Sequence, residues 1–178
     1  YWPVDFANVN KPEDWKHSVE GMQTLAPLAK QYDINLGMEV LNRFENHILN
    51  TAEEGVKFVQ EVGMDNVKVM LDTFHMNIEE DSFGDAIRMS GKYLGHFHLG
   101  EANRRPPFRG GRIPWDEIGE ALHDIEYTGT VVMEPFVRMG GTVGKDIRMW
   151  HDLSDNCPDE KLDQDVEESV RFLREIWE

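Results

Sequence analysis

Four residues that could bind a metal ion lie at or near the ends of four short apolar stretches. Glu39 lies in "GMEVL", Asp72 in "VMLDTFH", His98 in "GHFHLG" and Glu134 in "VVMEPF". Three carboxylates and one imidazole form an oxygen-rich ligand set that suits Mn²⁺, Mg²⁺ or Co²⁺, with Zn²⁺ as a further candidate. A bound cation would also offset the cost of placing a carboxylate such as Asp72 where a strand leaves a hydrophobic core.

Each of these residues also has a simpler interpretation. A single acidic residue at a strand end more often caps a helix or lies on the surface, and His98 alone is more often a hydrogen-bonded core histidine. His96 shares a strand face with His98, because residues two apart point the same way, so either could be the ligand. Together, four such residues at successive strand ends favour a metal site.

The elements that must position these residues alternate along the chain. Strands are expected at 34–41, 67–71, 94–99 and 130–134. Helices are expected from about 12 to 32, from Thr51 onward, near 82–90 and from about 115 to 125. Thr51 and Glu54 form a Thr-x-x-Glu capping box at the start of the second helix. Regular strand and helix alternation predicts βα units and one parallel sheet, whose strand ends meet at one rim.

The end of the chain predicts one more helix, over about 160–177. Its apolar side chains fall four, four, three and four residues apart, as on one face of an amphipathic helix: Leu162, Val166, Val170, Leu173 and Trp177. Two long loops, 100–114 and 135–158, follow strands on the side where parallel sheets and barrels build their sites. Loops of that length usually carry function or are mobile.

Composition restricts the classes of partner and compartment. With 34 acidic and 18 basic residues among 178, the formal net charge is −16, which argues against a nucleic-acid backbone as partner. Cys157 is the only cysteine, so no internal disulfide can form, and the reducing cytoplasm is the expected location. No apolar run approaches the ~18 residues of a membrane span, so no membrane partner is expected.

Several longer motifs carry a resemblance to a known family. "MEVLNRFENHILNT", "VKVMLDTFHMNIEED", "GHFHLGEANRR" and "VVMEPF" occur in order at βα spacing. They resemble the ketose 3-epimerases of the D-tagatose 3-epimerase and D-psicose (allulose) 3-epimerase family, which are xylose isomerase-like TIM barrels. The resemblance runs through essentially the whole chain. It implies an α/β fold, a (β/α)8 barrel, and epimerisation of a free ketohexose at C3 through an enediolate.

The resemblance also implies roles for individual residues. Glu39, Asp72, His98 and Glu134 match the family's metal ligands, which selects His98 over His96. Glu39 and Glu134 also match its acid/base pair. The residues that match its substrate shell are Glu45, His75, Arg104, Trp2 and Phe136. The implied cofactor is a divalent metal ion, Mn²⁺ first with Co²⁺ or Mg²⁺ as alternatives, and the implied assembly is a homo-oligomer, a dimer or tetramer.

The chain departs from the family pattern in length. About four βα units that precede "YWPVDF" in the family are absent, so residues 1–178 are expected to be the C-terminal part of a single barrel domain and to supply roughly its last four βα units. The loop 104–114 also departs from the family pattern and is about one residue longer than usual. Two alternatives stay open: another sugar isomerase of this barrel, such as a hydroxypyruvate isomerase or an inosose dehydratase, or a catalytically incomplete metal- or sugar-binding fragment. An endonuclease on this barrel fits the negative charge poorly.

Overall fold

A computed structural model describes residues 7–178, so Trp2 lies outside the described residues. The described chain forms one four-stranded sheet in the order β1-β2-β3-β4, with every neighbouring pair parallel. The strands are β1 (Leu36–Glu39), β2 (Val67–Asp72), β3 (Leu94–Leu99) and β4 (Thr130–Met133). The helices are α1 (Lys11–Gln31), α2 (Ala52–Val62), α3 (Thr73–Glu79), α4 (Phe83–Ser90), α5 (Trp115–Asp124), α6 (Gly141–Asp146) and α7 (Asp159–Trp177).

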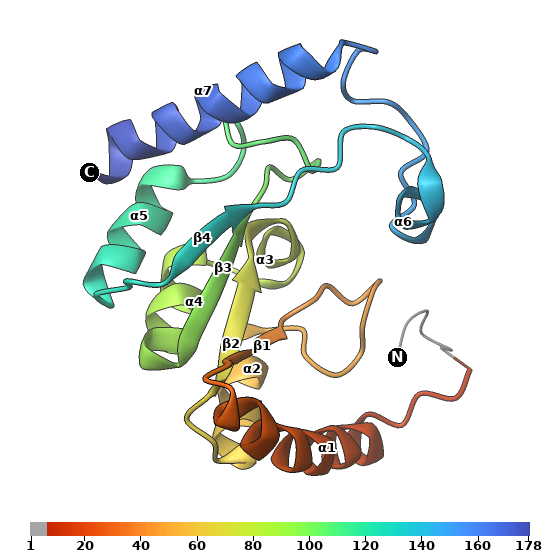
Figure 1. Ribbon diagram of the computed structural model, residues 1–178, viewed down its shortest axis with the longest axis vertical. Coiled ribbons are helices and arrows are strands. Elements are labelled where there is room, and N and C mark those ends of the chain that lie inside the picture. The colour runs from red at the N-terminus through yellow and green to blue at the C-terminus, as the bar shows by residue number, and fades with distance from the viewer. Residues whose placement is uncertain (1–6) are drawn as a thin grey trace.

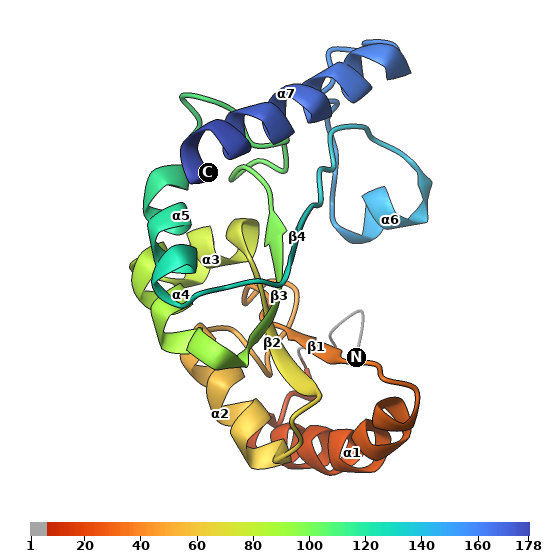
Figure 2. The ribbon, with the colours of Figure 1, turned by 60° about the vertical axis from the view of Figure 1, so that its left-hand side comes forward.

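The helices form an arc around the sheet. α2, α4 and α5 lie along one face, with α1 beyond α2 and α7 beyond α5 (Figures 1 and 2). The segment that contains α6 lies on the other side, near the ends of the strands (Figure 2). Sequential parallel strands with helices outside them are the arrangement of a TIM barrel wall.

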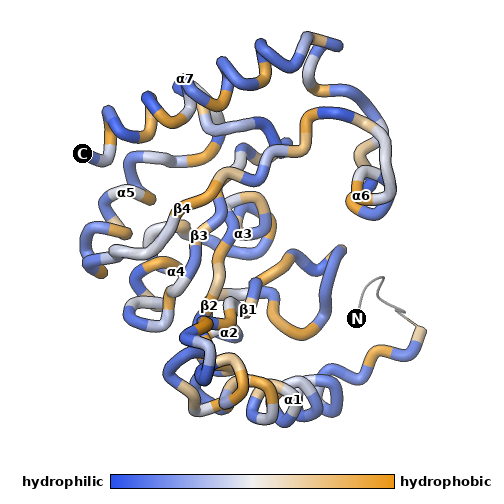
Figure 3. The backbone as a smooth tube through the Cα atoms, viewed as in Figure 1, coloured by the Kyte–Doolittle hydropathy of each residue, from blue (hydrophilic) through white to orange (hydrophobic). Residues whose placement is uncertain are grey.

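The main core lies between the sheet and this arc of helices. On β2, Val67, Val69 and Leu71 are buried, and the tube is coloured as apolar along most of β4 (Figure 3). Helix α2 approaches β2 closely at Gly55, where an added Cβ would lie 2.9 Å from Val40 and 3.2 Å from Val69. A larger residue at position 55 would therefore push α2 away from the sheet.

Helix starts follow the expected side-chain chemistry. Thr51 is the N-cap of α2, and its side chain accepts a hydrogen bond from the backbone N–H of Glu54. Ser82 caps α4 in the same way through the N–H of Asp85. These hydroxyls satisfy N–H groups that have no partner inside the helix, which defines where each helix begins. The capping box predicted at Thr51 is thus the true start of the helix.

Several expectations need correction. The segment 135–158, expected to be a loop throughout, contains α6, and the unexpected helix α3 begins directly after Asp72. Strands β1 and β4 are shorter than expected, and Glu134 lies one residue past β4. The apolar stripe of α7 was wrong at Val170, which is 37% exposed, whereas Phe172 and Ile176 pack against the core. The predicted stripe is confirmed at Leu173, which is buried, and at Trp177, which packs against the core.

Among the described residues, 7–178, no helix combines the length and the apolar character needed to cross a bilayer.

Candidate metal centre and substrate pocket

Strand register brings the four candidate ligands to one rim of the sheet. Asp72 on β2 is paired with His98 on β3, so their side chains lie side by side on one face. Glu39 on β1 pairs with Met70, one layer below Asp72. Glu134 comes two residues after Val132, the β4 partner of His98, and so lies one layer above. The four residues form a line slanted across the strands, as expected for staggered barrel strands.

The four side chains converge. Glu39, Asp72, His98 and Glu134 each offer one ligand atom, and these atoms all lie within 4.8 Å of one another. The Nδ1 atom of His98 is 3.8 Å from Asp72 Oδ2 and 3.7 Å from Glu134 Oε2. His96 stacks edge-on against His98, with 4.9 Å between ring centroids, but lies outside this group.

One buried nitrogen atom, His98 Nδ1, indicates that these four side chains suit a cation. His98 Nδ1 is buried and has no hydrogen-bond partner, although two carboxylates face it. A buried nitrogen without a partner is costly, and a cation shared with those carboxylates would satisfy it. Ligand atoms about 2.1 Å from one cation lie roughly 3 to 4 Å apart, so only small adjustments separate this arrangement from a coordination shell. The residues therefore fit a divalent metal ion.

The electrostatics of the cluster move its pKa values in different directions. Burial, reinforced by Asp72 and Glu134, raises the pKa of Glu39 to about 7. Burial also raises the pKa of Asp72. The neighbouring imidazole of His98 lowers the pKa of Glu134, and Glu134 in turn raises the pKa of His98. Three carboxylates this close repel one another, which is the condition that a bound cation relieves.

Asp72 combines the two interpretations that its sequence position allowed. Its Oδ1 caps α3 by accepting a hydrogen bond from the backbone N–H of Phe74 at 2.7 Å. Its Oδ2 faces the cluster and accepts a hydrogen bond from Arg104 at 3.0 Å. Asp72 is fully buried. The helix cap thus holds one carboxylate oxygen so that the other points into the site.

Arg104 joins the cluster from the loop between β3 and α5. Its guanidinium donates to Asp72 at 3.0 Å and to Glu134 at 2.9 Å. It lies between two aromatic rings, 3.9 Å from the centroid of Phe74 and 5.2 Å from that of Phe136. Its backbone is left-handed, with φ of 66°, a strained conformation for a residue with a side chain. Strain at a buried arginine indicates that the surrounding loop fixes Arg104 in this conformation.

Two residues of the predicted substrate shell, Glu45 after β1 and His75 on α3, are linked through a third residue, Asn42. His75 is 2% exposed, and burial lowers its pKa to about 3, so the imidazole is neutral. Its Nδ1 is bonded to Asn42, whose side chain also donates to Glu45 at 2.9 Å. Its Nε2 lies 3.9 Å from Glu39 and 3.4 Å from Arg104. His75 and Arg104 thus lie beside the candidate metal ligands, whereas Glu45 and Phe136 are linked to them through Asn42 and Arg104.

Three residues of this region were missed in the sequence. Asn42 lies in "EVLNRFENH" and Phe74 in "DTFHMN", both within the quoted motifs, but neither is ionisable and so neither stood out. Glu101 is buried and accepts hydrogen bonds from Trp115 Nε1 at 2.9 Å and from the Arg112 N–H at 3.0 Å. It ties the loop 100–114 to α5 and so supports Arg104. One indication of the role of Glu101 was present in the sequence, its place as an acidic residue near the arginines in "GEANRR".

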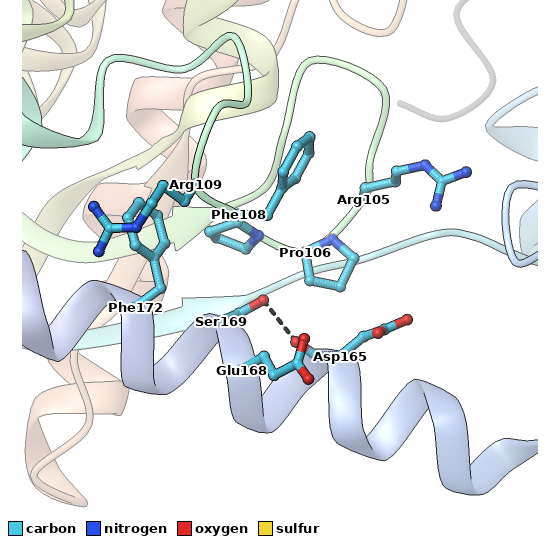
Figure 4. Close-up of a pocket in the computed structure, with 9 residues that line it drawn as sticks. Arg105, Pro106, Phe108, Arg109, Asp165, Glu168, Ser169 and Phe172 are labelled. Atoms are coloured by element: carbon cyan, nitrogen blue, oxygen red, sulfur yellow. Dashed lines mark hydrogen bonds between the residues drawn. The ribbon is translucent and has the colours of Figure 1, made fainter.

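Two hollows differ in their relation to the site. A small one, about 160 Å³, is lined by Glu45, Phe74, Arg104 and Phe136 together with the segment around α6. A larger one, about 430 Å³, lies between residues 105–109 and α7 (Figure 4). In it Arg109 lies over the ring of Phe172 at 5.1 Å. Of the predicted site residues, Glu45, Arg104 and Phe136 line the smaller hollow, and none lines the larger one.

The fold and site now allow comparison with known proteins. The model of the xylose isomerase-like TIM barrel family matches residues 2–176, and the chain belongs to that family. Within it, the chain is 60% identical over 175 residues to D-psicose 3-epimerase of Agrobacterium fabrum, covering 98% of this chain and 60% of that protein. It is 56% identical over 179 residues to D-psicose 3-epimerase of Ruminiclostridium cellulolyticum, covering 100% and 61%. The predicted resemblance is confirmed.

A solved structure extends the similarity to three dimensions. A crystal structure of D-psicose 3-epimerase with D-tagatose from Clostridium cellulolyticum superposes with a TM-score of 0.97 at 56% identity, covering 100% of this chain and 62% of that one. The predicted fold class is confirmed. The chain spans about three-fifths of the length of the curated relatives it matches.

Proposed function

We propose that this sequence supplies the metal-binding and acid/base half of a ketose 3-epimerase, which inverts C3 of a free ketohexose. The observation that carries the proposal is the convergence of Glu39, Asp72, His98 and Glu134 beside Arg104 at the strand ends. Relatives named D-psicose 3-epimerase at 56–60% identity support this reaction over other sugar isomerisations.

The four-residue group would hold the cofactor, a divalent ion, with Mn²⁺ first and Co²⁺ or Mg²⁺ as alternatives. Oxygen-rich sites with one imidazole suit these ions. The chemistry that such an ion would supply is Lewis acidity toward the C2 carbonyl of a ketose and toward the negative charge that develops when the C3 proton leaves.

Glu39 and Glu134 would carry the proton at C3. They come from the two outermost of the four strands, with Asp72 and His98 between them. One carboxylate removes the C3 proton, leaving the enediolate, and the other carboxyl group delivers a proton to the opposite face of C3. One group gains the proton that the other loses, so the substrate is inverted without net change in its protons.

The remaining residues would orient the sugar. His75 and Arg104 present polar atoms close to the metal-ligand group, and Glu45 is linked to His75 through Asn42. These three residues would bind the oxygens of the first carbons. Phe136 would form an aromatic wall beside Arg104, and Trp2 stays a predicted second wall. Fixing the sugar in this way places C3 between the two carboxylates, and such positioning contributes much of the rate of a bond-making step.

We propose that the activity requires a closed barrel of eight strands. The described residues form four strands, and a (β/α)8 barrel has eight. The unpaired edges of β1 and β4 would then meet further strands, which would contact C4 to C6 of the sugar. Assembly as a dimer or tetramer and a cytoplasmic location remain predictions.

The decisive experiment is turnover by the full-length protein. With Mn²⁺ and D-fructose, chromatography should detect D-psicose, and chelation should abolish it. In D₂O the product should carry deuterium at C3. Product without deuterium would contradict the enediolate. No D-psicose, but turnover of hydroxypyruvate or another sugar in a substrate panel, would assign the site to a different isomerase.

A further inference from the structure

Asn42 makes an unusual set of contacts at the side of the proposed site. It is 1% exposed and lies just after β1. Its backbone N–H donates to His75 Nδ1 at 3.2 Å, and its side-chain Nδ2 lies 2.9 Å from the same atom. Two groups of one residue therefore meet a single nitrogen of a buried imidazole.

The neighbours of Asn42 determine which end of its amide faces His75. The amide oxygen accepts a hydrogen bond from the backbone N–H of Phe44 at 2.9 Å. The amide nitrogen donates to the Glu45 carboxylate at 2.9 Å. A reversed amide would set oxygen against carboxylate and NH₂ against N–H, losing both bonds. The NH₂ group is therefore the one that faces Nδ1.

His75 Nδ1 consequently meets two N–H donors and no acceptor from Asn42. A proton on Nδ1 would oppose both, in the neutral ring as in the doubly protonated one. We propose that Asn42 is a positioning residue that holds His75 as the neutral tautomer with its proton on Nε2. His75 then serves as a hydrogen-bond donor at the site and not as a base.

A second hydrogen-bond donor lies close to the protonated Nε2 of His75. The guanidinium NH2 group of Arg104 lies 3.4 Å from it, and arginine cannot accept a hydrogen bond. The nearest carboxylate oxygen, on Glu39, is 3.9 Å away, too far for a hydrogen bond. Two donors that converge with no acceptor between them suit a single oxygen atom, most of all one that carries negative charge.

This inference deepens the proposed function and rests on it for the identity of that oxygen. In a 3-epimerisation, the ketose carbonyl oxygen gains negative charge as the C3 proton leaves. Donors fixed in advance stabilise that charge without reorganising during the reaction. The tautomer itself depends only on Asn42, Phe44, Glu45 and His75, whatever the substrate is.

The tautomer is measured by ¹⁵N NMR of the imidazoles in histidine-labelled full-length protein, with Mg²⁺ as a diamagnetic ion. The signals of His75 are assigned by their loss in His75→Gln. The expected pattern is a protonated Nε2 and an unprotonated Nδ1. A proton on Nδ1, alone or together with one on Nε2, would overturn the proposal.

Two variants test whether Asn42 sets this state. Asn42→Asp replaces the NH₂ donor by an acceptor, so the proton should move to Nδ1, and kcat should fall about 10²-fold with little change in KM. Asn42→Ala retains the backbone donor and should keep the wild-type tautomer with a smaller loss of kcat. If Asn42→Asp leaves both the spectrum and kcat as in wild type, the assignment is wrong. If that variant does not fold, the wild-type spectrum and Asn42→Ala still decide it, since a proton on Nδ1 in either would contradict the proposal.

Asn50→Asp provides the matched control. Asn50 belongs to the same loop and donates to the carbonyls of Leu41 and Asn46, without touching His75. It should lower thermal stability but leave the His75 spectrum unchanged, and a shifted spectrum would show that any damage to the loop moves the proton. Absence of epimerase activity in the wild type would refute the proposed function alone, because the spectrum reports the tautomer independently.

Discussion

The two middle strands and the two outer strands of the sheet contribute differently to the protein. On β2, Val69, Leu71 and Asp72 have no exposed surface, and on β3 Phe97 has none. On β4, by contrast, Val131 and Val132 are 39% and 38% exposed. The difference recurs at the site. Asp72, the candidate ligand on a middle strand, has a fully buried side chain, whereas the side chains of Glu39 and Glu134 are 32% and 35% exposed.

This difference in burial distinguishes a residue that is fixed in place, Asp72, from the two residues proposed to react, Glu39 and Glu134. Asp72 is tied to the Phe74 N–H and to Arg104, so its position is set by the core and by α3. Glu39 and Glu134 stand at the outer strands of the described sheet, and the proposed function assigns the proton transfer to them. A proton-transferring carboxylate must contact the reacting carbon, and a purely structural ligand need not. We therefore expect changes at the outer strands to affect turnover, and changes at the middle strands to affect stability.

The largest expected effect is on turnover at an outer strand. Glu134→Gln in the full-length protein keeps the size of the side chain but removes its basicity, so kcat should fall about 10³-fold or more. In the 178-residue chain, where the side chain is 35% exposed, the same change should alter the free energy of unfolding by less than about 1 kcal/mol. Steady-state kinetics and thermal melting measure both. Glu160→Gln, on the exposed start of α7, is the control, and near-normal turnover by Glu134→Gln would refute the acid/base assignment.

The second largest effect should come from metal binding, which involves residues of both the middle and the outer strands. Mn²⁺ at about 100 times its dissociation constant should stabilise the full-length protein by about 2.7 kcal/mol, because the ion binds only the folded site. His98→Ala should remove most of this shift in a thermal melt. His96→Ala, a change of the same kind two residues away on the same face, should retain it. A shift lost in His96→Ala and kept in His98→Ala would reverse the choice between the two histidines.

A third comparison concerns packing alone. Val69→Ala opens space between β2 and α2 and should destabilise the 178-residue chain by about 2 kcal/mol. Val132→Ala on β4, with the side chain partly in water, should cost less than about 0.5 kcal/mol. Urea unfolding of both variants gives the difference. Equal costs would mean that β4 is covered as fully as β2, and the contrast between the strands would fail.

The smallest effect tests one hydrogen-bonding side chain. Thr73 Oγ1 donates to the Gly100 carbonyl at 2.7 Å and accepts from the Gly100 N–H at 2.8 Å, which joins the ends of β2 and β3. Thr73→Val leaves both buried groups without partners and should cost about 1–2 kcal/mol. Thr130→Val, on exposed β4, is the matched change and should be nearly neutral in the same unfolding assay. A neutral Thr73→Val would show that other groups hold these strand ends together.

Much of the fold could be predicted because it depends on local pattern. Apolar runs of β length alternate with helical segments, and Thr51 with Glu54 marks a helix start by hydrogen bonds between near neighbours. The parallel order of the strands followed from that alternation. Helix α3 could not be predicted, because its seven residues carry little periodicity and its cap is Asp72 itself. The face of α7 was predicted correctly at Leu173 and Trp177 but not at Val170, because contacts with the rest of the fold, and not spacing alone, decide which side chains are buried.

The sequence by itself determined which residues could bind a metal and that their strands would run parallel, since both depend on residue type and alternation. Only the tertiary structure decided that the ligands lie on a slanted line across three registers, with Asp72 beside His98 and Glu39 one layer below. The same holds for Asn42 facing His75, 33 residues apart. Register and the contacts between distant loops arise from the packing of the whole sheet, which no local stretch of sequence specifies.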